Sequence, residues 1–164
     1  GSQQSWGRYL EVAPNGWSGK SVDPIARWCS ETYLRLSSTS SYDTYSKLGI
    51  GVAIGNGSFN TQLVLANCTS GASHLAHNYH GGGKMDWFLP SRDELNELAK
   101  YARISKSTAQ IDGGIISPLL EGFSEIYFTS SESGDAIYGQ NLTDGLIRQW
   151  DKSWDLAVRP IRSF

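Results

Sequence analysis

The chain has 164 residues, a formal net charge of −2, six Trp, eight Tyr and 18 Gly. That length suits one domain, and we expect a single domain over residues 3–164. Nucleic-acid sites usually need clustered Lys and Arg, so the weakly negative charge argues against a nucleic-acid partner. No run approaches the roughly 18 apolar residues of a membrane span, which predicts no membrane insertion. Gly1-Ser2 is typical of an expression scar, and we expect any targeting signal to lie upstream of it.

The aromatic and glycine content predicts short strands, tight turns and loops around aromatic anchors. Residues 8–13 alternate polar and apolar, which predicts a strand with Leu10 and Val12 on one face. The run from Trp17 to Ser46 is rich in Ser, Thr and Tyr. We expect it to be a surface excursion with a short turn or helix near residues 24–28.

A first helix is predicted from Asn60, which suits an N-cap, toward Tyr79. Apolar residues at helical spacing predict its buried stripe: Leu65, Cys68, Ala72, Leu75, Ala76 and Tyr79. Ser70-Gly71 predicts a break in the middle, because a glycine there costs about 1 kcal/mol.

A second helix is predicted from the capping box Ser91-Arg92-Asp93-Glu94. In this motif the Ser91 hydroxyl accepts a hydrogen bond from the backbone amide of Glu94, and the Glu94 carboxylate accepts one from the backbone amide of Ser91. The inward face of the helix is marked by apolar residues at helical spacing: Leu95, Leu98, Ala99 and Ala102.

The C-terminal part predicts strands over 125–130, 136–142, 146–150 and 156–164. Thr143-Asp144-Gly145 carries the Asp-Gly signal of a hairpin turn. Pro160 suggests an edge position or a bulge in the last strand. Helices and antiparallel strands together predict an α+β fold.

Cys29 and Cys68 are too few for a disulfide framework or an all-cysteine zinc site. We predict a Cys29–Cys68 disulfide, with two buried thiols as the alternative. The bridge would close a loop of about 40 residues and stabilise the fold by about 3–4 kcal/mol.

The run Gly82–Asn96 resembles the GGGK-DWFLPS-DEL signature of bacterial Lcl-type domains, a family named after a collagen-like surface protein. Three further segments match in order. Residues 127–132 are similar to the family's YWSSSE strand and residues 158–164 to its closing VRPVRAF. Tyr9–Pro14 with Trp17 is similar to its YLEAAP…W opening, so the resemblance covers nearly the whole chain.

The resemblance implies a C-type-lectin-like fold, in the superfamily that includes the formylglycine-generating enzymes. Its termini would pair in a sheet, with two helices, short antiparallel sheets and long loops. It also implies an extracellular or bacterial cell-surface location and a homotrimer formed through the parent protein. The family's namesake binds sulfated glycosaminoglycans, but its basic ligand surface has no counterpart in this slightly acidic sequence, so that ligand is not carried over.

The signature residues also have structural explanations. Trp87 and Phe88 suit core anchors. Arg159 and Arg162 are expected to pair with acids, for example the Glu132 or Glu94 carboxylate. The signature therefore predicts a fold rather than a binding site.

His74, His77 and His80 form an H-x2-H-x2-H pattern that allows a zinc site, although an exposed helix face is the expectation. No enzyme activity is predicted. The two cysteines lie too early and too far apart for formylglycine chemistry, and no G-x-S-x-G motif is present. Several late carboxylates keep carboxylate-pair hydrolysis open: Glu132, Asp135, Asp144, Asp151 and Asp155.

The late hairpin and loop hold the predicted ligand-binding residues: Asp135, Tyr138, Gln140, Asn141, Arg148, Trp150, Lys152 and Trp154. Tyr and Trp rings stack on sugars or anchor in protein partners, while Asp and Asn hold hydroxyls or Ca²⁺. The calcium-lectin signatures Glu-Pro-Asn and Trp-Asn-Asp are absent, so Asp151 and Asp155 are only candidate calcium ligands, and no other cofactor is expected. The alternative for Trp150 and Trp154 is that they cap the small sheet.

These observations predict a non-catalytic recognition or adhesion domain of a bacterial surface protein. Its partner would be a host or cell-surface glycan or protein, bound through the late hairpin and loop. The alternative is a structural or oligomerisation module that caps a larger surface protein.

Overall fold

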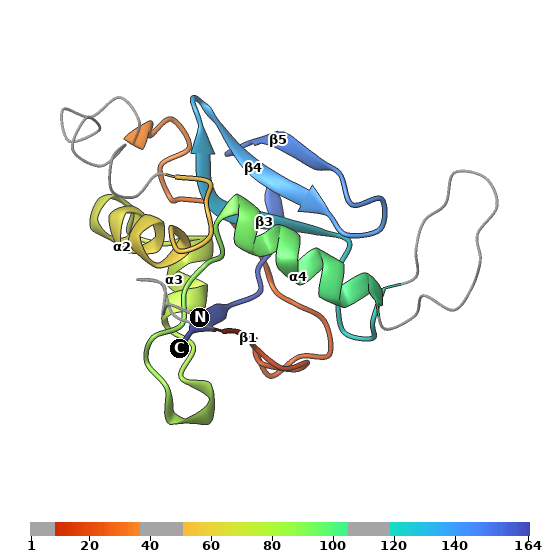
Figure 1. The fold of residues 1–164 in the computed structure, drawn as a ribbon. Helices are drawn as coiled ribbons and strands as arrows, with labels where there is room; N and C mark the ends of the chain where they lie inside the picture. Colours follow the sequence, from red (N-terminus) through yellow and green to blue (C-terminus); the bar gives the residue numbers. More distant parts are fainter. Residues whose placement is uncertain (1–8, 37–50, 105–118) are drawn as a thin grey trace.

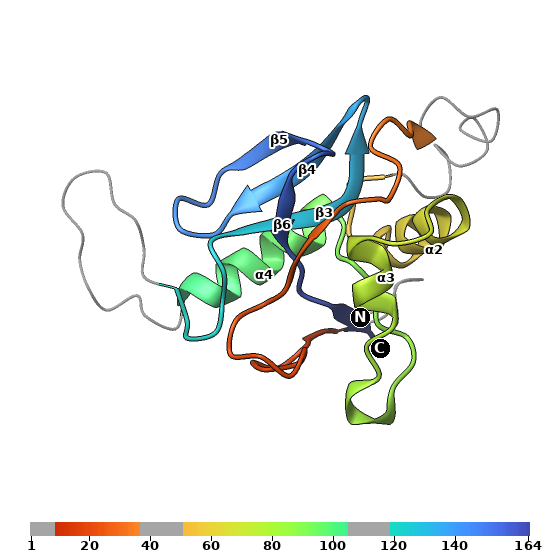
Figure 2. The same cartoon turned by 180° about the vertical axis from the view of Figure 1, so that it is seen from behind.

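The computed structural model describes residues 9–36, 51–104 and 119–164 (Figures 1 and 2). Within these ranges the helices are α2 (Gly57–Asn67), α3 (Ala72–His77) and α4 (Arg92–Ile104). The strands are β1 (Leu10–Val12), β2 (Ile25–Arg27), β3 (Ile126–Ser133), β4 (Ala136–Asn141), β5 (Ile147–Asp151), β6 (Asp155–Ala157) and β7 (Ile161–Ser163). The predicted α+β class is confirmed. None of the helices described is long and apolar enough to cross a bilayer.

The strands form two sheets. β1 and β7 pair antiparallel, and the other five strands follow the order β2-β6-β3-β4-β5, in which only the β3–β6 pair is parallel. The Tyr9 amide donates to the Phe164 carbonyl at 3.0 Å, so β1, the first strand described, lies beside β7, the last strand (Figures 1 and 2). The predicted last strand is two strands in different sheets, because the chain leaves β6 and reaches β7 through Pro160.

The prediction of a short turn or helix near residues 24–28 is wrong, since the strand β2 lies there. It pairs antiparallel with β6, with Ala26 opposite Leu156. Ala26 packs against the core, whereas Ile25 and Arg27 are exposed. Three residues are too few to display a period of two, so the sequence carries no strand signal at this place.

The predicted first helix is split, as Ser70-Gly71 indicated, into α2 and α3. Gly71 has a φ of +137°, and a Cβ there would lie 2.4 Å from the Trp28 carbonyl oxygen, so this junction requires glycine. The start was misplaced by four residues, since the N-cap is Asn56 instead of Asn60 and α2 begins at Gly57. Asn60 lies inside the helix instead, where its amide donates to the Gly51 carbonyl at 2.9 Å. Leu75, predicted on the buried stripe, is 37% exposed.

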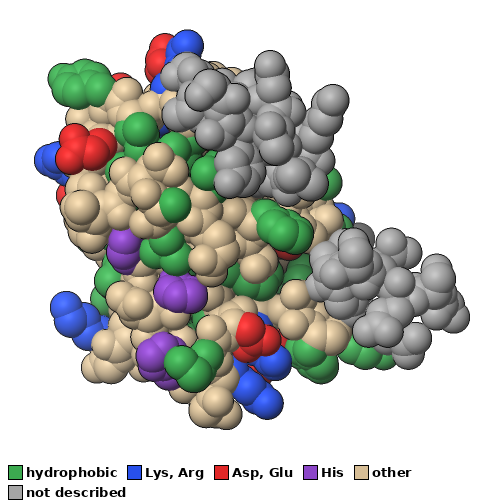
Figure 3. Space-filling model, turned by 90° about the vertical axis from the view of Figure 1, so that its left-hand side faces the viewer, with side chains coloured by type: hydrophobic (Ala, Val, Ile, Leu, Met, Phe, Trp, Pro, Cys, Tyr) green, Lys and Arg blue, Asp and Glu red, His purple; other side chains and the backbone are tan. Residues whose placement is uncertain are grey.

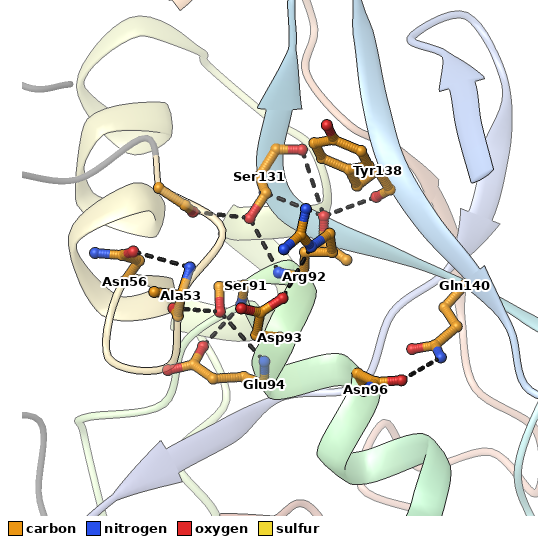
Figure 4. Close-up of polar contacts among 12 residues, drawn as sticks. Ala53, Asn56, Ser91, Arg92, Asp93, Glu94, Asn96, Ser131, Tyr138 and Gln140 are labelled. Carbon is orange, nitrogen blue, oxygen red and sulfur yellow. Dashed lines mark hydrogen bonds and ion pairs between the residues drawn. The ribbon is translucent and has the colours of Figure 1, made fainter. Parts of the chain in front are cut away.

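The capping box of α4 is confirmed. The Ser91 amide donates to the Glu94 carboxylate at 2.7 Å, and the Glu94 amide donates to the Ser91 hydroxyl at 3.3 Å. The same hydroxyl donates to the Ala53 carbonyl, which fastens the loop before α2 to the start of α4 (Figure 4). The four predicted inward residues of α4 are all buried.

Two apolar clusters occupy the two faces of the large sheet. Phe128 belongs to a cluster with Trp28 and residues of α2 and α3, whereas its neighbour Tyr127 belongs to a cluster with Leu95 and other residues of α4. This alternation follows from the period of two along β3. Each large side chain that is fully buried contributes about 1.5–3 kcal/mol of transfer free energy. Trp87 and Phe88 are also buried, as expected.

The prediction of Glu132 or Glu94 as the acidic partner of Arg159 and Arg162 is wrong. Arg159 is buried, and its Nε donates to the Asp23 carboxylate at 2.7 Å. Arg162 donates two parallel hydrogen bonds, of 2.9 and 3.0 Å, to Asp86 and a third to Glu11. Asp23 lies 136 residues from Arg159, a separation at which sequence spacing carries no information.

Candidate functional site

A small hollow lies at the end of the large sheet where two turns meet the segment that follows β2. Its volume is 260 Å³, and its lining residues are Thr32, Tyr33, Leu34, Asp135, Asp151 and Ser153. Asp135 lies in the β3–β4 turn, and the register of β4 and β5 places its neighbour Ala136 opposite Asp151. The Tyr33 side chain is 99% exposed and stands at the edge of this hollow.

The segment that carries Thr32 and Tyr33 is held to α2 by covalent and hydrogen bonds. The predicted Cys29–Cys68 disulfide is confirmed. Next to it, the Ser30 amide donates to the Ser70 carbonyl at 2.9 Å, and the Thr69 amide donates to the Ser30 hydroxyl at 3.0 Å. These bonds fix the start of the segment against the helical side of the molecule.

Lys152 fixes the other end of the segment from beneath the hollow. Its side chain is buried, and Nζ donates to the Glu132 carboxylate and to the Leu34 carbonyl. Nζ also lies 4.9 Å from the centre of the Trp28 ring, in a cation–π contact. The Glu132 carboxylate in turn accepts the Leu36 amide at 3.1 Å. Lys152 was predicted to contact ligand, and this is corrected: it supports the hollow from inside the protein.

The charged groups of the hollow are carboxylates. Asp135 forms an ion pair with Arg35, and its side chain is largely exposed. Hydrogen bonds from the side chain and amide of Ser153 hold the pKa of Asp151 below its usual range. Together with the neighbouring hydroxyls and the Tyr33 ring, these oxygens can accept hydrogen bonds from hydroxyl, amide or ammonium groups.

The two late tryptophans have different roles. Trp150 is half-buried and packs against the Phe128 cluster, and its ring covers Gly139, where a Cβ would lie 2.6 Å from Trp150 Cδ1. Trp154 meets it edge-to-face at 5.5 Å between ring centres but is itself 55% exposed. The capping role thus applies to Trp150. Trp154 is available to a partner and belongs to the same turn as Ser153 and Asp151.

Two of the predicted ligand-binding residues face α4 instead of solvent. Gln140 is 1% exposed, and its amide donates to Asn96 at 2.9 Å and to the Gly145 carbonyl at 3.1 Å (Figure 4). Tyr138 is half-buried, with the Arg92 guanidinium 5.4 Å from its ring centre. The prediction for Gln140 is therefore corrected, because α4 covers that face of β4.

Asn141 and Arg148 lie at the opposite end of the hairpin from the hollow. The Asn141 side chain accepts the Thr143 amide at 2.8 Å and so shapes the turn. Arg148 is exposed and donates to the Asp144 carboxylate at 2.7 Å. Of the eight predicted ligand-binding residues, only Asp135 lines the hollow, and Trp154 directly follows the lining residue Ser153.

The candidate metal ligands are also dispersed. Asp151 lines the hollow, whereas Asp155 lies on β6 and its carboxylate is 3.8 Å from Arg27 Nε. The three histidines gather on one face of the molecule (Figure 3). Burial and the neighbouring His77 hold the pKa of His74 below its usual value. In the described part of the chain, no group of three or more His, Cys, Asp or Glu is placed to hold a metal ion.

Three residues that line the hollow were not predicted from the sequence: Thr32, Tyr33 and Ser153. The cysteine pair was the available signal, since a disulfide at Cys29 places the next few residues beside whatever Cys68 packs against.

No protein-family model, no curated protein and no solved structure matches this chain.

Proposed function

We propose that this chain is a non-catalytic recognition or adhesion domain, with the 260 Å³ hollow and Trp154 as its ligand-binding surface. The observation that carries the proposal is the convergence of three separate segments on one small polar hollow, on a support of a disulfide and a buried ion pair. Such a support holds exposed groups in fixed positions, which lowers the entropy cost of binding.

The chemistry of the hollow favours the end of a glycan chain, or one polar side chain of a protein partner. Tyr33 and Trp154 offer aromatic faces for a sugar ring, and Asp135 and Asp151 offer acceptors for its hydroxyls. Drug-sized ligands usually occupy about 300–1,000 Å³, so a hollow of 260 Å³ suits a single ring or side chain better than a buried substrate.

The carboxylates of the hollow support a binding role over hydrolysis. Carboxylate-pair hydrolysis needs one carboxyl group whose raised pKa keeps it protonated as the general acid. Hydrogen bonds lower the pKa of Asp151, and Asp135 is paired with the Arg35 guanidinium. Asp151 therefore acts as a hydrogen-bond acceptor in this proposal.

The expected C-type-lectin-like fold and extracellular location are part of the same proposal. The pairing of the first and last strands and the loops carried by a second sheet agree with that fold. The disulfide is typical of secreted and cell-surface proteins.

An array of glycans and host matrix proteins, probed with the domain in calcium and again with a chelator, tests the proposal. We expect binding that Tyr33→Ala and Trp154→Ala each weaken by about tenfold, the value of one lost aromatic contact. Phe59→Ala, at an exposed aromatic residue of α2, is the matched control and should bind as the wild type does. Full binding by the Tyr33 and Trp154 variants would refute this site. Loss of binding in chelator would indicate that the ligand binds through a calcium ion held near Asp151.

A second candidate function, an oligomerisation module, is supported by a different hollow. A hollow of 390 Å³ between α4 and the β1–β7 pair is lined mainly by apolar residues: Leu10, Val12, Glu94, Glu97, Leu98, Tyr101 and Ile161. It lies beside the β1–β7 pair, which the backbone hydrogen bonds between Tyr9 and Phe164 extend. Small-angle scattering that gives a trimer would favour this candidate, and a monomer at all concentrations would count against it.

A further inference from the structure

β2 is an edge strand, and half of its backbone groups point away from the sheet. The Val158 amide donates to the Pro24 carbonyl at 3.0 Å, and the register pairs Ala26 with Leu156. Hydrogen-bonded pairs alternate in an antiparallel ladder, so the amides and carbonyls of Ile25 and Arg27 point outward. Among the described residues no other backbone group bonds to them. Such an edge is a template for another strand.

Two adjoining hollows lie beside this edge, over α3. The first has 540 Å³ and is lined by Ala26, Arg27, Ser30, Ser70, Gly71, His74, Leu75 and Asn78. The second has 380 Å³ and is lined by Trp17, Ser18, Lys20, Pro24, Leu75, Asn78 and Tyr79. Leu75 and Asn78 line both, so we treat them together as the β2–α3 trough. It borders the histidine face seen in Figure 3.

The floor of this trough is apolar and its charged groups are cationic. Leu75 and Trp17 contribute apolar surface, and Lys20 and Arg27 are the charged residues of the lining. No Asp or Glu lines either hollow, although the chain as a whole has a net charge of −2. Two acids lie beside the lining. Asp23 accepts the Trp17 indole N–H at 2.9 Å, but it is buried and ion-paired with Arg159. Asp155 lies 3.8 Å from Arg27, and both side chains are more than half exposed, so water screens this pair strongly.

We propose that the β2–α3 trough binds an extended acidic peptide segment of a partner protein, which adds as a strand to β2. The peptide backbone would pair with the outward groups of Ile25 and Arg27. Alternate side chains point to opposite faces of a strand, so apolar residues would rest on Leu75 while acidic residues meet Arg27 and Lys20. This surface is separate from the Asp151 hollow and does not depend on the ligand bound there.

Fluorescence anisotropy with two labelled heptapeptides tests the proposal, one alternating Glu and Val and the other alternating Lys and Val. We expect the acidic peptide to bind at least about tenfold more tightly, because only its charges complement the trough. Lys20→Glu/Arg27→Glu, at two exposed side chains, should reverse this preference. Any of three results overturns the proposal: equal binding of the two peptides, a preference for the acidic peptide that the charge reversal leaves unchanged, or no saturable binding of the acidic peptide.

Two proline variants test the strand addition itself. Ile25→Pro removes an outward amide, at an edge position where proline is tolerated. Ile147→Pro is the matched control on β5, the other edge strand of the large sheet. The Asn141 amide donates to the Leu146 carbonyl, so Asn141 and Leu146 are a hydrogen-bonded pair and the amide of the next residue, Ile147, points outward. With folding verified by circular dichroism, we expect about a tenfold loss of acidic-peptide affinity for Ile25→Pro only. The same loss in both variants, or in neither, contradicts pairing at β2.

Discussion

Lys152 is the residue whose role differs most from its sequence context. It lies between two tryptophans in a polar turn, where an exposed cation was the natural expectation, yet its side chain is buried against Glu132 and Trp28. Gln140 is a similar case, since α4 covers it. Residue type predicts that a polar group needs partners, but only the fold decides whether water or protein supplies them.

Lys152→Met is expected to destabilise the fold by about 3–5 kcal/mol, because it leaves the Glu132 carboxylate buried without its cation. The free energy of unfolding in urea measures the effect. Lys100→Met, which breaks the exposed Lys100–Glu97 pair, should cost at most about 1 kcal/mol. Adding Glu132→Leu to Lys152→Met should recover part of the loss. Equal effects of the two single substitutions would show that Lys152 is solvated.

Asp86→Asn tests the contact of Asp86 with Arg162 through its pH dependence. Hydrogen bonds from Arg162 hold the pKa of Asp86 below its usual value. A lowered folded-state pKa stabilises the protein above the unfolded pKa of about 3.9, and this stabilisation is lost as pH falls through the folded pKa. Because Asp86 is half-exposed, we expect the variant to lose about 0.5–1 kcal/mol at pH 7.

Thermal unfolding of the wild type and Asp86→Asn from neutral to acidic pH measures this difference. The two melting temperatures should converge as the solution is acidified below the usual Asp pKa. Molar salt at neutral pH should also reduce the gap, since it screens an exposed pair. A constant gap at all pH values would assign the effect to packing instead of charge.

At the scale of elements, local sequence signals predicted those parts of the fold that local chemistry determines. The capping box of α4, the hairpin of β4 and β5, and the break before α3 are all determined by a few neighbouring residues, and all three were predicted. β2 was not predicted, because its partner β6 lies far along the chain. The start of α2 was misplaced because Asn60 lies inside the helix, where its side chain bonds to the Gly51 carbonyl instead of capping the helix.

The Cys29–Cys68 disulfide connects this scale to the candidate site. Replacing both cysteines by alanine should lower the free energy of unfolding by about 3–4 kcal/mol, since the bridge closes a loop with a sequence separation of 39. Because the bridge fixes the segment that carries Tyr33, ligand affinity should fall as well. Urea unfolding and binding of the same sample separate the two effects. A variant that unfolds more easily but binds fully when folded would show that Lys152 alone positions the segment.

At the scale of the whole molecule, the sequence indicated the fold class but not the location of the ligand site. The α+β class followed from helix and strand periods, and the disulfide from the count of cysteines. The hollow depends on three turns brought together from residues 30–36, 133–136 and 151–154, which is a property of the tertiary structure. The eight residues predicted from one hairpin were dispersed because a hairpin has two faces and two ends, and α4 covers one of the faces.

Hydrogen–deuterium exchange of the domain, with and without the ligand that the array identifies, tests the central claim most directly. We expect slower amide exchange on binding in residues 31–36, 133–136 and 151–155, and unchanged exchange around residues 141–148 at the other end of the hairpin. Slower exchange confined to residues 141–148, or to the α4 hollow near Tyr101, would contradict the proposed site.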